Sequence, residues 1–262
     1  MGKAVSMTRM KYALLCWSVI GSICLSAEEF TVDGIEFVYR APSTHSPDSR
    51  IMILFGGRNW NGTKTLNTYR FESLAEKHKL FLLSPSFCDR EYWNPEKWSG
   101  PALKKAVFEL EKRYRLTPGK LYLYGYSAGG QCANLFYAWM PERIAAWGAH
   151  GCGVFFRKEI RNPVPALLSC GDEDRERFEL SKLFLYRYRE SGGRLLWKPY
   201  RGVGHELNAA ALRLARAWFD AQLSGMRAME FGEDDTGQIR QGIDPEYRNP
   251  LETPEIRQYW KP

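Results

Sequence analysis

The stretch LYLYGYSAGGQCANLFYAWM, residues 121–140, decides how this chain folds. An apolar and aromatic run, residues 121–124, leads into a helix-forming segment, and Ser127 stands at the corner in the pattern G-x-S-x-G. Gly125 and Gly129 have no β-carbon, so a strand and a helix can approach each other closely around the serine. The pattern predicts a strained strand-to-helix turn that exposes the Ser127 hydroxyl at a helix N-terminus, where backbone N–H groups stabilise an anion.

A serine hydroxyl becomes a nucleophile only when a base takes its proton and an acid orients that base. The chain has four histidines. The strand–serine–helix pattern resembles the α/β-hydrolase arrangement, which implies that the acid and then the histidine follow the serine along the chain and so excludes His45 and His78. No plausible acid strand lies between Ser127 and His150. His205 remains, in the loop GVGHE between a strand-like run and a long helix, and it is the predicted base. A solvated loop histidine is the alternative.

The acid is expected after the apolar run at residues 164–169, which is typical of a buried parallel strand. Gly171-Asp172-Glu173-Asp174 follows this run. We favour Asp174 because the chain can turn after the glycine before the carboxylate points back at the imidazole. Asp172 is the runner-up, and Asp172 or Glu173 could instead cap the following helix.

An oxyanion hole needs two N–H donors. The first is expected from the residue after the serine, Ala128, and the second from the loop after an earlier central strand. Residues 50–55 form that strand and the glycine pair that ends in Gly57 follows it. Gly57 is the predicted second donor, with Arg58 as the alternative.

Alternating strand-like and helix-like segments predict an α/β fold in which a mostly parallel sheet carries helices on both faces. A hairpin is expected at residues 30–39, with Asp-Gly at its turn. Further strands are expected at 51–55, 80–85, 121–124, 144–150, 164–169 and 194–199, and helices at 66–79, 100–114, 178–190 and 207–223, besides the one after Ser127.

Two loops bear on substrate choice. The segment 151–163 is short, so we expect no substantial lid and an open cleft suited to a bulky or polymeric ester. Aromatic residues in the loop 86–100 and in the oxyanion loop could stack on a sugar or phenolic group, or could pack the loops onto the body. These candidate substrate-binding residues are Trp60, Tyr92, Trp93 and Trp98.

The ends of the chain differ from its middle. The chain starts with basic residues, which are followed by a short apolar core at residues 12–24 and by small residues up to Ala27. This pattern predicts a cleaved export signal over residues 1–27. The protein is therefore expected to be secreted or periplasmic, with no stable membrane span. A retained N-terminal anchor is the alternative. One catalytic domain is expected over 28–224. The acidic, proline-containing segment 225–262 carries aromatic residues that predict docking onto this domain.

Composition excludes several other classes of function. The formal net charge is +7, but no concentrated Lys/Arg run is present, so nucleic acid is not an expected partner. Four cysteines follow the signal: Cys88, Cys132, Cys152 and Cys170. Their spacing matches no zinc motif, and we expect neither metal nor cofactor. An oxidising compartment permits a Cys152–Cys170 disulfide, and buried free thiols are an equal alternative.

The chain resembles the α/β-hydrolase superfamily over roughly residues 30–224. The motifs that carry the resemblance are GYSAGGQ, the glycine-rich loop FGGRNWNG and the late GVGHE. Within the superfamily, the chain is similar to secreted esterases of the feruloyl-esterase and polyhydroxybutyrate-depolymerase kind. This resemblance implies Ser127, Asp174 and His205 as a triad, with Gly57 and Ala128 as oxyanion donors. Phe55 is a departure, because many relatives have histidine before the glycines.

The chain is therefore expected to be an exported serine hydrolase of carboxylic esters, with an open cleft suited to bulky esters, including those linked to a polysaccharide or a polyester. A serine peptidase similar to prolyl oligopeptidase is a second hypothesis, weakened because nothing resembles a propeller domain. A third is a non-catalytic binding protein on a hydrolase scaffold, against which the complete set of catalytic parts argues.

Overall fold

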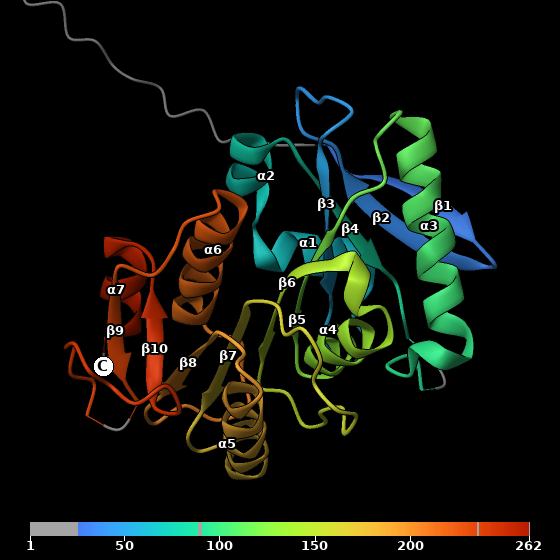
Figure 1. Ribbon diagram of the computed structural model, residues 1–262. Helices are drawn as coiled ribbons and strands as arrows, with labels where there is room; N and C mark the ends of the chain where they lie inside the picture. The colour runs from blue at the N-terminus through green and yellow to red at the C-terminus, as the bar shows by residue number, and fades with distance from the viewer. Residues whose placement is uncertain (1–25, 89–90, 235, 262) are drawn as a thin grey trace, which may run out of the picture.

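A central sheet organises the molecule, which was analysed as a computed structural model that describes residues 26–88, 91–234 and 236–261 (Figure 1). Over these residues the sheet has eight strands: β1 (Glu28–Val32), β2 (Ile35–Arg40), β3 (Arg50–Phe55), β4 (Leu80–Pro85), β5 (Leu121–Tyr126), β6 (Ile144–His150), β7 (Ala166–Gly171) and β8 (Leu195–Tyr200). They lie in the order β1-β2-β4-β3-β5-β6-β7-β8. β2 pairs antiparallel with β1 and β4, and all later pairs are parallel.

Helices cover both faces of the sheet, as the sequence predicts (Figure 1). One face carries α3 (Gly100–Arg113), α4 (Ala128–Trp139) and α5 (Arg175–Glu190). The other carries α1 (Gly62–Tyr69), α2 (Glu72–His78), α6 (Ala209–Leu223) and α7 (Pro254–Trp260). Short π-helical and 3-10 turns lie at Pro95–Ser99 and Pro141–Arg143. Each face has its own apolar core, with Trp147 fully buried in the first and Trp218 in the second.

The expected helix at residues 66–79 is wrong, because the structure has two helices there, α1 and α2. Arg70 adopts a left-handed conformation, with φ of 54°, and ends α1. Tyr69 and Phe71 are both fully buried in the same core. Residues two apart point to nearly opposite sides of a continuous helix, so both side chains reach this core only because the helix breaks between them.

The topology gathers the predicted site at one edge of the sheet. β3, β5, β7 and β8 are parallel, so their carboxyl ends lie at the same edge. The loops that follow these four strands carry the glycine pair, Ser127, the acidic cluster and His205. This placement is where open α/β sheets bind their ligands.

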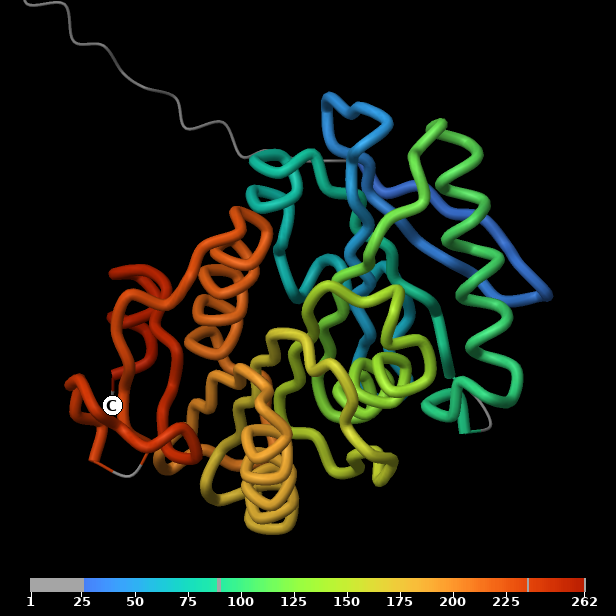
Figure 2. The backbone as a smooth tube through the Cα atoms, in the orientation of Figure 1, coloured from blue at the N-terminus to red at the C-terminus, as the bar shows by residue number. Residues whose placement is uncertain are grey.

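The segment from residue 225 onward lies beside β8, at the far end of the sheet from the β1–β2 hairpin (Figure 2). It contains a two-stranded sheet, β9 (Glu230–Glu233) with β10 (Arg248–Leu251), and α7. Asn249 accepts a hydrogen bond of 2.6 Å from the Trp197 N–H, and the Trp260 indole donates to the Trp197 carbonyl at 2.8 Å. The segment therefore pairs backbone groups of an edge strand that would otherwise be open to other chains.

Two expectations concern residues at the limits of the structure. Most of the predicted signal, residues 1–25, lies outside the described residues. Within the described part of the chain, no helix combines the length and the apolar character that a membrane crossing requires.

The thiols of Cys132, Cys152 and Cys170 are free and buried, so the Cys152–Cys170 pair is not joined, and Cys88 is free and exposed.

Candidate active site

Ser127 occupies a strained turn between β5 and α4. Its φ of 56° and ψ of −119° lie in a region that costs a non-glycine residue on the order of 1–3 kcal/mol. A β-carbon on Gly125 would lie 2.1 Å from the Gly129 carbonyl oxygen, and one on Gly129 would lie 2.1 Å from that of Phe55. Only glycine fits both positions, so the G-x-S-x-G spacing fixes this turn. Because α4 begins at the next residue, the serine stands at a helix N-terminus.

The structure brings Ser127, His205 and Asp174 into one hydrogen-bonded line. The Ser127 Oγ lies 2.8 Å from the His205 Nε2, and the His205 Nδ1 lies 2.6 Å from the Asp174 Oδ2. A carboxylate only accepts hydrogen bonds, so the Nδ1 carries the proton and the Nε2 is free to accept the serine proton. The Asp174 side chain is 6% exposed, whereas the His205 side chain is 33% exposed.

The two candidate acids occupy different positions. Asp174 faces His205 and also accepts a hydrogen bond of 3.0 Å from Arg177, one turn along α5. Asp172 instead accepts a hydrogen bond of 2.8 Å from the Gly202 N–H at the surface. The geometry therefore places Asp174, and not the runner-up Asp172, behind the imidazole. Asp172 holds the start of the loop that carries His205.

The two predicted oxyanion donors lie on segments that touch each other. The Gly129 Cα packs against the carbonyl groups of Phe55 and Gly56, which brings the start of α4 against the end of β3. Gly57 is buried, and the alternative donor Arg58 is exposed. This contact brings the segment that carries Gly57 beside the segment that carries Ala128.

Sequence reasoning missed the residues that hold these segments together. The Tyr69 hydroxyl is fully buried, donates to the Phe55 carbonyl at 2.6 Å and accepts from the Tyr126 N–H at 2.9 Å, so it joins the ends of β3 and β5. Arg177 neutralises part of the charge of Asp174. No motif marks these residues, because each is recognised only by its three-dimensional neighbours.

Tyr126, which precedes the serine in the G-x-S-x-G pattern, lies against His205. Its ring stacks on the His205 ring with centroids 5.3 Å apart, and its hydroxyl donates to the His205 carbonyl at 3.0 Å. Burial, and next the charge of Asp174, raise the pKa of the Tyr126 phenol. The phenol therefore stays protonated and keeps its role as a donor.

The four predicted aromatic residues divide between core and surface. Tyr92 is 4% exposed, and its ring packs against Phe87 and Trp93. Trp60 is half-buried beside Tyr126, with ring centroids 5.9 Å apart. Trp98 packs edge-on against Phe87, with centroids 5.4 Å apart, and lines a groove. Packing thus accounts for Tyr92, and Trp93 is half-buried against the same core, while Trp60 and Trp98 are half-buried, beside Tyr126 and beside the groove respectively.

The groove beside Trp98 has a volume of about 870 Å³. It lies between the turn of the β1–β2 hairpin, the oxyanion loop at Asn61 and the segment after β4 at Ser86. β4 neighbours β3, so this groove lies along the same edge of the sheet as Ser127, past the loop that follows β3. Its other lining residues mix carboxylate, lysine and apolar groups: Asp33, Gly34, Ile35, Glu36, Cys88, Lys97, Pro101 and Ala102.

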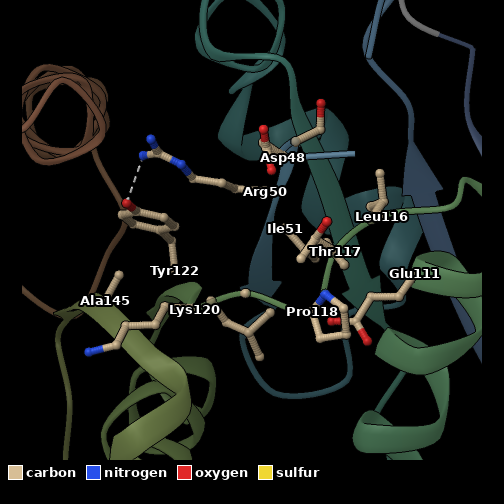
Figure 3. Close-up of a pocket in the computed structure, with 13 residues that line it drawn as sticks. Asp48, Arg50, Ile51, Glu111, Leu116, Thr117, Pro118, Lys120, Tyr122 and Ala145 are labelled. Carbon is tan, nitrogen blue, oxygen red and sulfur yellow. Dashed lines mark hydrogen bonds between the residues drawn. The ribbon is translucent and has the colours of Figure 1, made fainter. Parts of the chain in front are cut away.

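A second cavity, of about 420 Å³, lies at the opposite edge of the sheet (Figure 3). It surrounds the first residues of β3 and β5, and Arg50 there donates to the Tyr122 hydroxyl at 3.0 Å. No member of the Ser127–His205–Asp174 line reaches it.

Among the described residues, no group of three or more His, Cys, Asp or Glu side chains is placed to hold a metal ion.

Comparison of the sequence with known proteins gives one distant relative among curated proteins. This is a bifunctional acetylxylan esterase/xylanase, XynS20E, from Neocallimastix patriciarum, to which the chain is 23% identical over 158 residues. The match covers 57% of this chain but only 23% of that protein, so the chain corresponds to less than a quarter of the relative. No family model matches the sequence.

Comparison of the structure gives many similar folds. LpqC, a poly(3-hydroxybutyrate) depolymerase from Bordetella parapertussis, matches with a TM-score of 0.56 and 18% identity over 77% of this chain and 94% of that one. An esterase from Pyrobaculum calidifontis matches with a TM-score of 0.59 and 14% identity over 78% and 85%. A thermostable esterase matches with a TM-score of 0.55 and 22% identity over 68% and 54%. The chain has the α/β-hydrolase fold, as its motifs predict.

Proposed function

We propose that this chain, on its α/β-hydrolase fold, is an exported serine hydrolase that cleaves carboxylic esters through Ser127, His205 and Asp174. The observation that carries the proposal is the unbroken line from the Ser127 Oγ through the imidazole to a buried carboxylate, with distances of 2.8 and 2.6 Å. A nucleophile, its base and an orienting acid at the mouth of a strained turn are the parts that acyl transfer requires.

In this mechanism the His205 Nε2 takes the Ser127 proton as the serine oxygen attacks the ester carbonyl. The N–H groups of Ala128 and Gly57 donate to the oxyanion, and each such donor contributes about 3–4 kcal/mol to transition-state stabilisation. The imidazolium, held by Asp174, then protonates the leaving alcohol. A water molecule gives its proton to His205 as it attacks the acyl-enzyme carbonyl. The imidazolium then returns that proton to the Ser127 Oγ as its bond to the acyl group breaks, which releases the carboxylic acid and restores the free serine.

We infer that the substrate is bulky, such as an ester linked to a polysaccharide or a polyester. The segment 151–165 between β6 and β7 contains neither helix nor strand, which supports an open site without a lid. The groove of about 870 Å³ beyond the oxyanion loop offers room for the part of the substrate that does not react. The acetylxylan esterase/xylanase and the poly(3-hydroxybutyrate) depolymerase among the similar proteins support the same class.

The remaining proposals concern organisation. We propose that residues 1–27 direct export to a secreted or periplasmic location and are removed. Residues 28–224 would then be the catalytic domain. The contacts of the segment 225–262 with β8 support a role as a fixed cover for that edge of the sheet.

An ester panel tests the proposal. Purified protein from residue 28 onward should hydrolyse p-nitrophenyl esters and at least one of acetylated xylan, feruloyl ester and hydroxyalkanoate oligomer. Ser127→Ala should reduce kcat by about 10³-fold or more, as loss of a nucleophile does, and Ser191→Ala, at the end of α5, serves as the matched control. Turnover of aminoacyl anilides without ester turnover would favour a peptidase, and equal activity of Ser127→Ala would refute the mechanism.

A further inference from the structure

Two side chains that the mechanism does not use lie opposite each other at the ends of neighbouring strands. Tyr126 on β5 and His150 on β6 are register partners, and their ring centroids lie 5.8 Å apart. Ser127 follows Tyr126 directly, and the Tyr126 ring also stacks on the His205 ring. The His150 side chain is buried, with 1% of the residue exposed, and it needs partners for both ring nitrogens.

These two side chains hold consecutive carbonyl groups of the loop that carries the base. The Tyr126 hydroxyl donates to the His205 carbonyl at 3.0 Å, and the His150 Nε2 lies 2.8 Å from the Glu206 carbonyl. A carbonyl oxygen can only accept, so the Nε2 carries the proton. The His150 Nδ1, 2.8 Å from the Ser169 Oγ, therefore accepts from that hydroxyl. Every polar atom of the buried imidazole is thus paired.

The backbone of His150 completes the connection. Its carbonyl accepts a hydrogen bond of 2.8 Å from the Ser127 N–H, at the strained turn itself. One residue therefore binds the nucleophile segment through its backbone and the base segment through its side chain. Burial lowers the pKa of the His150 imidazole to about 4, which keeps the ring neutral at physiological pH.

The loop that carries the base needs such an anchor. Gly202 and Gly204 precede His205, and a β-carbon on either would meet no atom within 4 Å. Gly202 also adopts a positive φ of 67°. A segment with two glycines and open space around them has many accessible conformations. Asp172 and the Glu173 N–H hold the start of this segment, at Gly202 and the Val203 carbonyl, so Tyr126 and His150 act on its second half, at His205 and Glu206.

We propose that Tyr126 and His150 are positioning residues that together fix the His205 loop, and so set the approach of the imidazole to the Ser127 hydroxyl. This inference rests on the proposed function. The two hydrogen bonds hold the peptide planes on either side of the Glu206 Cα, and the first of these planes adjoins the His205 Cα, so they restrain the backbone from which the imidazole projects. The pair acts through His205 and does not itself touch the reacting atoms.

The tyrosine arm of the proposal has a matched control on the same strand. Tyr126→Phe removes only the hydroxyl that binds the His205 carbonyl and keeps the stacked ring. We expect kcat to fall about 10-fold with KM within about 2-fold, because a misplaced catalytic group costs turnover rather than binding. Tyr124→Phe removes a buried hydroxyl that has no hydrogen-bond partner among the described residues, and it should leave both constants unchanged.

The histidine arm is tested by rescue. His150→Leu removes the donor to Glu206, and we expect kcat to fall about 100-fold. His150→Gln keeps an amide N–H that reaches the same carbonyl, so it should recover about 10-fold of that loss. The role of His150 would be overturned if the two variants had equal kcat. It would also be overturned if the loss of kcat matched the fraction of unfolded protein measured in thermal melts.

Hydrogen–deuterium exchange over residues 200–208 separates this inference from the proposed function. Tyr126→Phe and His150→Leu should speed exchange in this segment by about 10-fold or more, and Tyr124→Phe should not, whether or not the protein hydrolyses esters. If wild type turns over no ester but exchange follows this pattern, the function is wrong and the anchoring stands. If esters are cleaved and exchange does not change, the anchoring is wrong.

Discussion

Replacing Asp174 by asparagine tests the candidate triad at a single atom. The Asp174 carboxylate is 6% exposed and accepts 2.6 Å and 3.0 Å hydrogen bonds from His205 and Arg177. An asparagine whose oxygen keeps the Arg177 bond presents its NH₂ group to the His205 Nδ1. The imidazole must then carry its proton on Nε2, where it can no longer accept the proton of Ser127.

This tautomer change predicts a large effect on turnover. A serine hydrolase with the wrong histidine tautomer loses about 10⁴ in kcat, which corresponds to about 5.5 kcal/mol of transition-state stabilisation. The assay is steady-state hydrolysis of a p-nitrophenyl ester at pH 7.5, with a thermal melt to confirm folding. Asp172→Asn is the control, because an asparagine oxygen can still accept from the Gly202 N–H, and kcat should stay within about 3-fold. The reasoning is refuted if Asp174→Asn keeps more than a tenth of the wild-type kcat.

Three further outcomes concern stability. Gly129→Ala places a β-carbon 2.1 Å from a backbone carbonyl oxygen of β3 and should lower the free energy of unfolding in urea by about 3 kcal/mol or more. Gly119→Ala is the control, because its new β-carbon would lie 3.7 Å from the nearest atom outside its chain neighbours. It should change the free energy of unfolding by less than about 0.5 kcal/mol. His150 has its pKa lowered from 6.5 to about 4 by burial, so its contribution of about 3 kcal/mol is complete above pH 6.5 and is lost as the pH falls through 4. Burial raises the pKa of Glu252 from 4.5 to about 7, so this group makes the free energy of unfolding fall with pH over nearly the same pH range. The contribution of His150 is therefore measured as the difference in unfolding free energy between wild type and His150→Gln. A difference that stays constant from pH 4 to 7 would contradict it. Asn249→Ala leaves the buried N–H group of β8 without its acceptor and should cost about 3 kcal/mol in urea unfolding, and a change below about 0.5 kcal/mol would mean that the C-terminal segment does not hold that edge.

The nucleophile turn could be predicted from sequence because its requirements are local. Gly125 and Gly129 are the positions where no side chain fits, and their spacing around Ser127 is visible in the sequence. His205 could be predicted from order, since parallel strands bring the loops at their carboxyl ends together. Local sterics and strand order are both properties that a single sequence carries.

The choice between Asp172 and Asp174 illustrates what a sequence does not carry. Both follow Gly171 within three residues, and either could have faced the histidine. The structure turns tightly there, with the Asp174 N–H bonded to the Gly171 carbonyl at 3.3 Å and Asp172 committed to the Gly202 N–H. The outcome depends on a partner segment thirty residues away along the chain.

The supporting residues were beyond prediction for the same reason. Tyr69 lies 57 residues before its partner Tyr126, and His150 lies 56 residues before Glu206. In the sequence, a tyrosine or a histidine at such a position cannot be told from an ordinary core residue, because its hydrogen-bond partner becomes its neighbour only when the sheet forms. The broken helix around Arg70 is a related case, because the need to bury Tyr69 and Phe71 on one side outweighs local helix preference.

The most direct measurement is covalent labelling of the protein with a fluorophosphonate, which reacts with a serine only when a base activates it. Trypsin releases residues 121–143 as one peptide in which Ser127 is the sole serine, so the mass of that peptide reports the modification. The account predicts a single adduct on Ser127 in wild type and no adduct in Ser127→Ala or His205→Ala. An adduct at another serine, or equal labelling after loss of His205, would contradict the claim that these side chains work as one catalytic unit.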